Sequence, residues 1–250
     1  MGTVHMLQTG PVLQLQLENK GRANAIDFEM LGRLDECITH VESSDEIRLV
    51  LLRGSAGGAF SSGADIHAWS PLSPQAFRRD WIDYGNDIID RFARLRCPSI
   101  AVIEGMCFGG GFELALAADM RIGTSQASFR FPEVGIAALP GWRGGLRLQR
   151  LVGMGRMMEV VLFTHTITAE AALSWGVLNV LCDEQNLQRE LQRYIDTCTQ
   201  LSPQAQALAK AHLVPPEHDT ALALATEIMR ASPDAELGLH AFRSKQTPHY

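Results

Sequence analysis

Three consecutive glycines and a nearby glutamate stand in the stretch "IAVIEGMCFGGGFELALAADM", residues 100–120. The apolar run before the glycines is typical of a buried strand, and the residues after them are typical of a helix. The first N–H groups of a helix have no carbonyl partner within it and lie at the positive end of its dipole. Because glycines let a carbonyl group approach these donors, the turn is a candidate oxyanion site. We expect Glu113 to lie within the first helical turn, beside those amides.

A tight connector is the alternative interpretation of the glycines, since glycine tolerates positive φ and close packing. Two phosphate-binding motifs are excluded. A dinucleotide fingerprint needs glycine where Leu114 stands, and a P-loop needs a Gly-Lys-Ser/Thr sequence that is absent here. The pKa of Glu113 is left open, because the helix start would lower it and burial would raise it.

A second carboxylate, Glu133, lies in "FRFPEVGIAALPGWRGG", residues 129–145. The residues around it are largely apolar, among them Phe131, Val134 and Leu139. A glutamate in such surroundings either reaches water or is buried for a functional reason. Glu133 is therefore the second candidate for acid–base chemistry.

The elements that would hold these groups alternate between strands and helices, which predicts an α/β fold. Leucines alternate with polar residues over 11–21, so this segment is a half-buried strand, and Asp27 is the expected N-cap of the next helix. Residues 55–69 are expected to form a loop. We predict an α/β core over residues 1–185 and a helical region over 186–250. Strands are predicted at 11–21, 47–54, 98–105, within 119–136 and at 177–183, and helices at 26–45, 73–96, from the glycines to about 118, and at 186–201, 203–213, 219–231 and 233–245.

The composition is that of an ordinary globular protein: 250 residues, 46% hydrophobic, 20% charged, with a net charge of −6. The negative charge argues against nucleic acid or an acidic membrane surface as a partner. Five scattered cysteines without a CxxC pair indicate reduced thiols in the cytoplasm. Neither a signal peptide nor a membrane span is expected, and no histidine or cysteine spacing predicts a metal site.

Several segments, taken together and in order, resemble the enoyl-CoA hydratase/isomerase family, the crotonase superfamily. They cover nearly the whole chain, from 11 to 250. The resemblance implies a spiral of β-β-α turns and a C-terminal helical region that drives formation of trimers, often paired into hexamers. The segments are "AFSSGADI" (59–66), "IAVIEGMCFGGGFELALAADMRI" (100–122), "FRFPEVGIAALPGWRGGLRLQRLVG" (129–153), "TAEAALSWGVLNVL" (168–181), "LSPQAQALAKAHL" (201–213) and "DAELGLHAFRSKQTPHY" (234–250).

The resemblance also implies a role for individual residues. The backbone N–H groups of Ala64 and Gly110 would hold the oxygen of an acyl-CoA thioester, and Glu113 and Glu133 would flank a water molecule. Gly141 would offer its N–H near that water, with Trp142 beside it in the acyl site. The coenzyme A site would include Arg22, Ala23, Ala64, Asp65, Ile66, Phe242 and Lys245.

Hydration of a 2-enoyl-CoA is the activity that this constellation favours, with Glu113 activating water and Glu133 protonating Cα. No cofactor is expected beyond the coenzyme A of the substrate. An enoyl-CoA isomerase is the alternative, since relatives can isomerise with the Glu133 position alone. Another crotonase-type reaction, and a non-catalytic acyl-CoA- or RNA-binding protein, also remain. Where the family often has small residues, Trp142 and Arg143 either reshape the acyl pocket or are packing changes.

Overall fold

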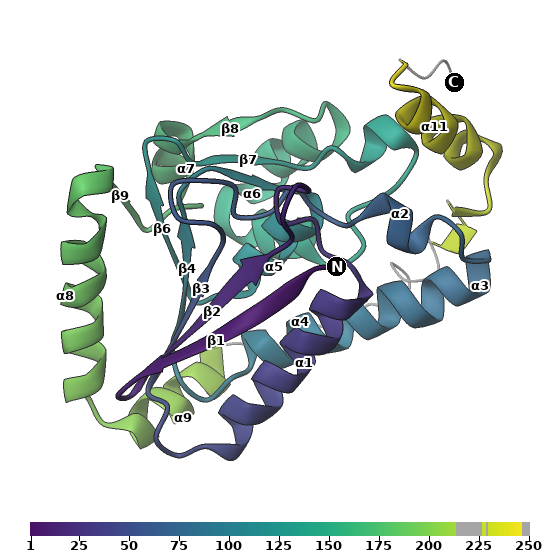
Figure 1. Cartoon of the computed structure of the whole chain (residues 1–250). Coiled ribbons are helices and arrows are strands. Elements are labelled where there is room, and N and C mark those ends of the chain that lie inside the picture. The colour runs from purple at the N-terminus through teal and green to yellow at the C-terminus, as the bar shows by residue number, and fades with distance from the viewer. Residues whose placement is uncertain (214–226, 229, 247–250) are drawn as a thin grey trace.

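The computed structural model describes residues 1–213, 227–228 and 230–246 (Figure 1). Its strands are β1 (Thr3–Thr9), β2 (Val12–Glu18), β3 (Leu49–Arg53), β4 (Ser99–Ile103), β5 (Met106–Phe108), β6 (Met120–Thr124), β7 (Ser128–Arg130), β8 (Ile167–Thr168) and β9 (Val180–Cys182). Its α-helices are α1 (Phe28–Ser43), α2 (Ile66–Trp69), α3 (Pro74–Ala76), α4 (Tyr84–Ala93), α5 (Gly109–Ala117), α6 (Gly144–Leu162), α7 (Ala169–Trp175), α8 (Leu187–Gln200), α9 (Pro203–Leu213) and α11 (Pro233–Ser244). A π-helical segment η1 (Phe77–Asp83) precedes α4, and short 3₁₀ turns form η2 (Glu133–Ile136) and η3 (Glu184–Asn186).

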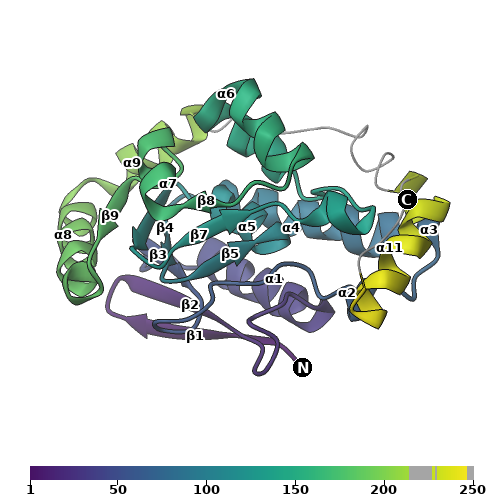
Figure 2. The same cartoon turned by 90° about the horizontal axis from the view of Figure 1, so that it is seen from above.

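The strands form two sheets. The larger has the order β1-β2-β3-β4-β6-β9, and its strands pair in parallel except for the antiparallel β1–β2 pair. The smaller has the order β5-β7-β8. Figures 1 and 2 both place α11 at the end of the molecule opposite α8, next to α2 and α3.

The central strands are buried on both faces, which explains their nearly continuous apolar sequences. Val50 and Leu52 of β3 belong to the main core, together with side chains of α1 and α4. Leu49 and Leu51 point to the opposite face, where they pack with Leu187 and other residues of α8. Helices therefore cover both faces of the larger sheet (Figure 1).

Most of the predicted elements are confirmed. The alternation over 11–21 is strand β2, in which Leu13, Leu15 and Leu17 are buried, and Asp27 caps α1 by accepting the Met30 N–H at 2.9 Å. The helices predicted at 203–213 and 233–245 are α9 and α11. Most of the helix predicted at 219–231 lies outside the described residues.

The predicted elements omit α6, α7 and two further pieces of local structure. Strand β1 was not predicted, because it is an edge strand in which Val4 alone is fully buried, so no alternation marks it. The expected loop at 55–69 ends in helix α2, whose N-cap Asp65 accepts the His67 N–H at 3.0 Å. A helix of four residues is too short to show periodicity.

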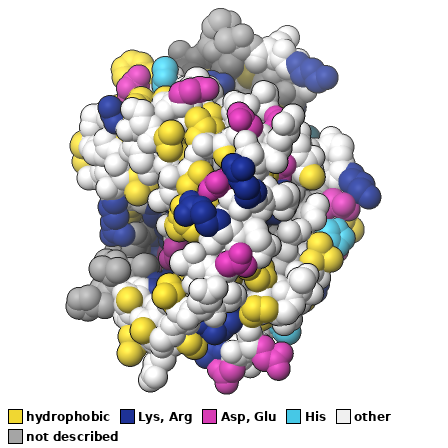
Figure 3. Space-filling model, turned by 90° about the vertical axis from the view of Figure 1, so that its left-hand side faces the viewer, with side chains coloured by type: hydrophobic (Ala, Val, Ile, Leu, Met, Phe, Trp, Pro, Cys, Tyr) yellow, Lys and Arg dark blue, Asp and Glu magenta, His cyan; other side chains and the backbone are white. Residues whose placement is uncertain are grey.

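The surface carries charges of both signs. Figure 3, which views the molecule from the side of α8, shows Lys and Arg side chains interspersed with Asp and Glu rather than gathered in a basic stripe. Within the described residues, no helix combines the length and apolar character that crossing a bilayer requires.

Candidate active site

The candidate oxyanion site lies where two backbone segments run side by side. Ser61 N donates to Met106 O at 3.1 Å, and Phe108 N donates to Ser61 O at 2.9 Å. This pairing is parallel, so Ala64 and Gly110 meet three residues further along. A methyl group added to Gly110 would lie only 3.4 Å from the Ala64 nitrogen.

The N–H groups of Ala64 and Gly110 are both available to a ligand. Ile26 pairs with the residues on either side of Ala64, because its N–H donates to Gly63 O at 2.8 Å and its carbonyl accepts from Asp65 N at 2.7 Å. In parallel pairing, the N–H of the residue between them faces the other way. Gly110 lies in the first turn of α5, where N–H groups have no intrahelical partner. The two segments thus bring together the two donors that the sequence predicted.

Glu113 is the one ionisable side chain of α5, a helix whose nine residues are all buried. The prediction that it lies in the first turn was wrong: the helix begins at Gly109, so the glycines form the first turn and Glu113 follows in the second. Its Oε1 accepts the N–H groups of Trp142 and Gly144, both at 2.8 Å. Gly144 permits this approach, since a methyl group there would lie 2.4 Å from Glu113 Cγ.

Burial decides the pKa of Glu113. Desolvation raises it to about 7, although the N–H groups of Gly144 and Trp142 and the charge of Arg147 act in the opposite direction. The helix start does not keep this carboxyl strongly acidic, because the side chain is fully enclosed. Glu113 can therefore exchange a proton near neutral pH.

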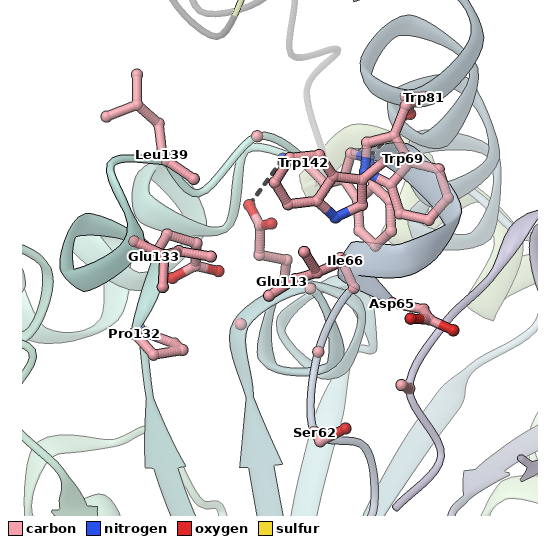
Figure 4. Close-up of a pocket in the computed structure, with 18 of the residues that line it drawn as sticks. Ser62, Asp65, Ile66, Trp69, Trp81, Glu113, Pro132, Glu133, Leu139 and Trp142 are labelled. Atoms are coloured by element: carbon pink, nitrogen blue, oxygen red, sulfur yellow. Dashed lines mark hydrogen bonds between the residues drawn. The ribbon is translucent and has the colours of Figure 1, made fainter. Parts of the chain in front are cut away.

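Glu133 opens the 3₁₀ turn η2, and its Oε2 is buried without a hydrogen-bond partner among the described residues. Burial and then the nearby charge of Glu113 raise its pKa well above the ordinary value. The close approach of Glu133 requires glycine at position 109. Gly109 has φ +50°, and a methyl group on it would lie 2.9 Å from Glu133 Oε1. Figure 4 shows the carboxyl groups of Glu113 and Glu133 facing the same space.

Both carboxyl groups line a cavity of about 460 Å³ (Figure 4). Two of the predicted coenzyme A residues, Ala23 and Lys245, do not line the cavity. The Ala23 carbonyl accepts the Ser62 N–H at 2.8 Å. Lys245 is exposed and caps the C-terminal end of α11. His67, an exposed residue, also lines the cavity. The other predicted site residues all line it, namely Arg22, Ala64, Asp65, Ile66, Gly110, Glu113, Glu133, Gly141, Trp142 and Phe242.

The rim of the cavity near α2 carries an ion pair. Arg22 Nη1 donates to Asp65 Oδ2, and the other oxygen of Asp65 caps α2. Asp65 is buried, whereas the Arg22 side chain is half exposed. The cation therefore reaches the solvent side of the site and is oriented by a fixed carboxylate.

The cavity has an aromatic wall, of which only Trp142 was predicted from the sequence. The Trp81 and Trp142 rings lie 5.2 Å apart, as do those of Trp69 and Phe77, and all four residues line the cavity. The i, i+4 spacing of Phe77 and Trp81 indicates a common helix face, but not which cavity that face borders.

Trp142 and Arg143 have different roles. Trp142 is buried against Gly110, and its Nε1 donates to Trp81 O at 3.1 Å, so its ring narrows the cavity beside Gly110. Arg143 does not line the cavity, because its guanidinium pairs with Asp90. The alternative of a packing change is therefore correct for Arg143.

Comparisons with known proteins show the family to which the chain belongs. The profile of the family described as Enoyl-CoA hydratase/isomerase matches residues 8–250. A short-chain-enoyl-CoA hydratase of Clostridium acetobutylicum is 31% identical over 91% of this chain and 88% of its own length. A carnitinyl-CoA dehydratase of Salmonella enteritidis PT4 is 31% identical over 99% of this chain and 88% of its own length.

Solved structures share the fold. An enoyl-CoA hydratase/isomerase from Xanthobacter autotrophicus Py2 superposes with a TM-score of 0.87 at 26% identity, covering 97% of this chain and 93% of that one. An enoyl-CoA hydratase from Bacillus anthracis superposes with a TM-score of 0.79 at 28% identity, covering 99% of this chain and 98% of that one. The α/β crotonase fold predicted from the motifs is therefore confirmed, and the chain belongs to the enoyl-CoA hydratase/isomerase family.

Proposed function

We propose that the protein catalyses the reversible hydration of a 2-enoyl-CoA to the 3-hydroxyacyl-CoA. One observation carries this proposal: two buried carboxyl groups with raised pKa values face one cavity beside two converging N–H donors. Hydration needs a base for water, an acid for Cα and donors for the developing oxyanion. The matched hydratase of C. acetobutylicum supports the same assignment.

In the proposed mechanism, the thioester oxygen accepts the N–H groups of Ala64 and Gly110. Ionised Glu113 takes a proton from water as the water oxygen bonds to Cβ, and the π electrons move onto the thioester oxygen. Glu133, whose pKa burial and the nearby charge of Glu113 raise well above its ordinary value, gives its proton to Cα. Glu113 then carries one proton more and Glu133 one fewer, and transfer across the shared cavity restores the starting state.

Incubation with crotonyl-CoA is the test of this function. We expect the conjugated enoyl absorbance to fall and the product to gain the mass of one water molecule. A 3-enoyl-CoA serves as the comparison, since an isomerase would convert it to the conjugated thioester without a change in mass. If the protein consumed the 3-enoyl-CoA but not crotonyl-CoA, it would be an isomerase and the proposed hydratase activity would be wrong.

The side chains that line the cavity beyond the two glutamates favour a substrate with an uncharged acyl group. Among the described residues that line the cavity, Arg22 is the one Lys or Arg, and it lies at the rim, paired with Asp65. A carboxylate at the far end of the acyl chain would be desolvated without a Lys or Arg partner, which costs several kcal/mol. The acyl end of the cavity is formed by Trp69, Phe77, Trp81, Ile82, Ile136, Leu139 and Trp142.

A matched pair of substrates tests this preference. We expect kcat/KM for pent-2-enoyl-CoA to exceed, by at least about 100-fold, that for the analogue whose terminal methyl is a carboxylate; each factor of ten corresponds to about 1.4 kcal/mol. Steady-state kinetics on both substrates gives the ratio. Equal values would show that a charged acyl group finds a partner in the site.

The proposal includes a homotrimer or a pair of trimers in the cytoplasm. Exposed apolar side chains along and beyond α6 support an interface between copies. The five cysteines form no disulfide, in keeping with a reducing compartment. The exposed apolar residues are Leu151, Met154, Met158, Leu162 and Phe163.

A further inference from the structure

Arg147 joins the backbone that binds Glu113 to a buried carboxylate on another helix. It lies in the first turn of α6 and is buried. Its Nη1 donates to Trp142 O at 2.8 Å, and its Nη2 donates to Asp90 Oδ1 at 2.6 Å. Trp142 is thereby held on both sides, since its carbonyl binds Arg147 and its N–H binds Glu113.

The turn between the two Glu113 donors has an unfavourable conformation. Arg143, between Trp142 and Gly144, has φ +63° and ψ 14°, which is the left-handed region. Non-glycine residues adopt this region at a cost, so surrounding contacts must hold it. One contact is the ion pair of Arg143 with Asp90 Oδ2, which means that Asp90 anchors both arginines.

We propose that Arg147 is the positioning residue of Glu113: anchored on Asp90, it holds the Trp142 carbonyl so that the N–H groups of Trp142 and Gly144 converge on Glu113 Oε1. This inference rests on the proposed function insofar as Glu113 is the base. Arg147 contacts no reacting atom in this scheme. It acts through the backbone that it orients and through its charge.

The charges around Glu113 give the direction of the expected effect. Glu133 faces it from η2, and the charge of ionised Glu113 raises the pKa of Glu133. Arg147 faces Glu113 from α6 and lowers its pKa. Asp90 of α4, the C-cap residue Arg94 and the neighbouring Arg143 form the surrounding ion-pair cluster. Loss of Arg147 removes a favourable charge and loosens two N–H donors. Both changes raise the pKa of Glu113.

The test compares wild type with Arg147→Met in two titrations. One is the acid limb of kcat/KM for crotonyl-CoA, and the other follows the infrared carboxyl band that disappears in Glu113→Gln. We expect both midpoints to move upward from about pH 7. A rise of about one unit would lower the ionised fraction at pH 7 about fivefold, and activity should recover as the pH increases. Arg147→Lys, which keeps the charge but not the two-pronged geometry, should give a smaller shift.

Arg94→Met is the matched control, because Arg94 also pairs with Asp90, at 3.3 Å, but from a more exposed position. It should leave both midpoints unchanged. An equal shift in Arg94→Met, or no shift in Arg147→Met, would overturn the inference. If Arg147→Met fails to fold, an unshifted Arg147→Lys overturns it. If the wild type hydrates no enoyl-CoA, the proposed function fails, but the infrared titration still decides the role of Arg147.

Discussion

Glu113→Gln is expected to lower kcat for crotonyl-CoA hydration by roughly 10²- to 10⁴-fold, the range typical of a lost general acid or base. KM should change little. Glutamine has the same shape, and its Oε1 can still accept the N–H groups of Trp142 and Gly144, so the turn keeps its structure. What it loses is the ability to take a proton from water. Steady-state kinetics near the pH optimum measures the effect.

Glu104→Gln provides the matched control for this substitution. Glu104 is also a largely buried glutamate with fixed partners, pairing with Arg53 at 2.5 Å and accepting the Gly57 N–H at 3.0 Å, but it does not line the cavity. Its replacement should leave kcat unchanged. If Glu113→Gln hydrated crotonyl-CoA at the wild-type rate, Glu113 would not be the base.

Gly110→Ala should reduce kcat/KM by roughly 10²- to 10³-fold, the usual effect of losing one oxyanion donor. The added methyl group would lie 2.6 Å from Trp142 Cζ3 and 3.4 Å from Ala64 N. To make room, either the indole or the start of α5 must move, and the Gly110 and Ala64 donors then no longer converge. Kinetics with crotonyl-CoA, together with thermal unfolding, separates lost catalysis from lost folding.

Gly145→Ala is the control for the added methyl group. Gly145 also lies in the first turn of a helix near the site, and a methyl group there would meet no atom within 4 Å. This variant should keep both activity and stability. Wild-type kcat/KM in a folded Gly110→Ala protein would exclude the Ala64–Gly110 oxyanion site.

Sequence reasoning succeeded where the signal is local. The alternation of Leu13, Leu15 and Leu17 predicts β2, because a strand with one polar face imposes period two on its residues. The N-cap role of Asp27 is equally local, since it depends on a side chain reaching a backbone N–H three residues away. The edge strand β1 was not predicted, because it has too little buried surface to impose an alternation of apolar and polar residues.

The candidate site was only partly predictable. The glycines and the two glutamates stand out in the sequence, since their residue types are chemically unusual in apolar surroundings. Only Trp142 of the aromatic wall was predicted, because it follows Gly141, whereas Trp69, Phe77 and Trp81 lie in other segments and look like ordinary core residues. Nothing local relates Asp90 to Arg147, which lies 57 positions away.

By itself, the sequence determined the class of fold, the family and the identity of the acid–base candidates, because periodicity and ordered motifs record local backbone geometry. The tertiary structure alone decided the pKa of Glu113, in which burial outweighs the neighbouring N–H groups and Arg147. It also decided that Arg143 turns toward Asp90 and away from the cavity. The physical reason is the same in each case: desolvation and ion pairing depend on which distant segments surround a group, and only the folded chain specifies them.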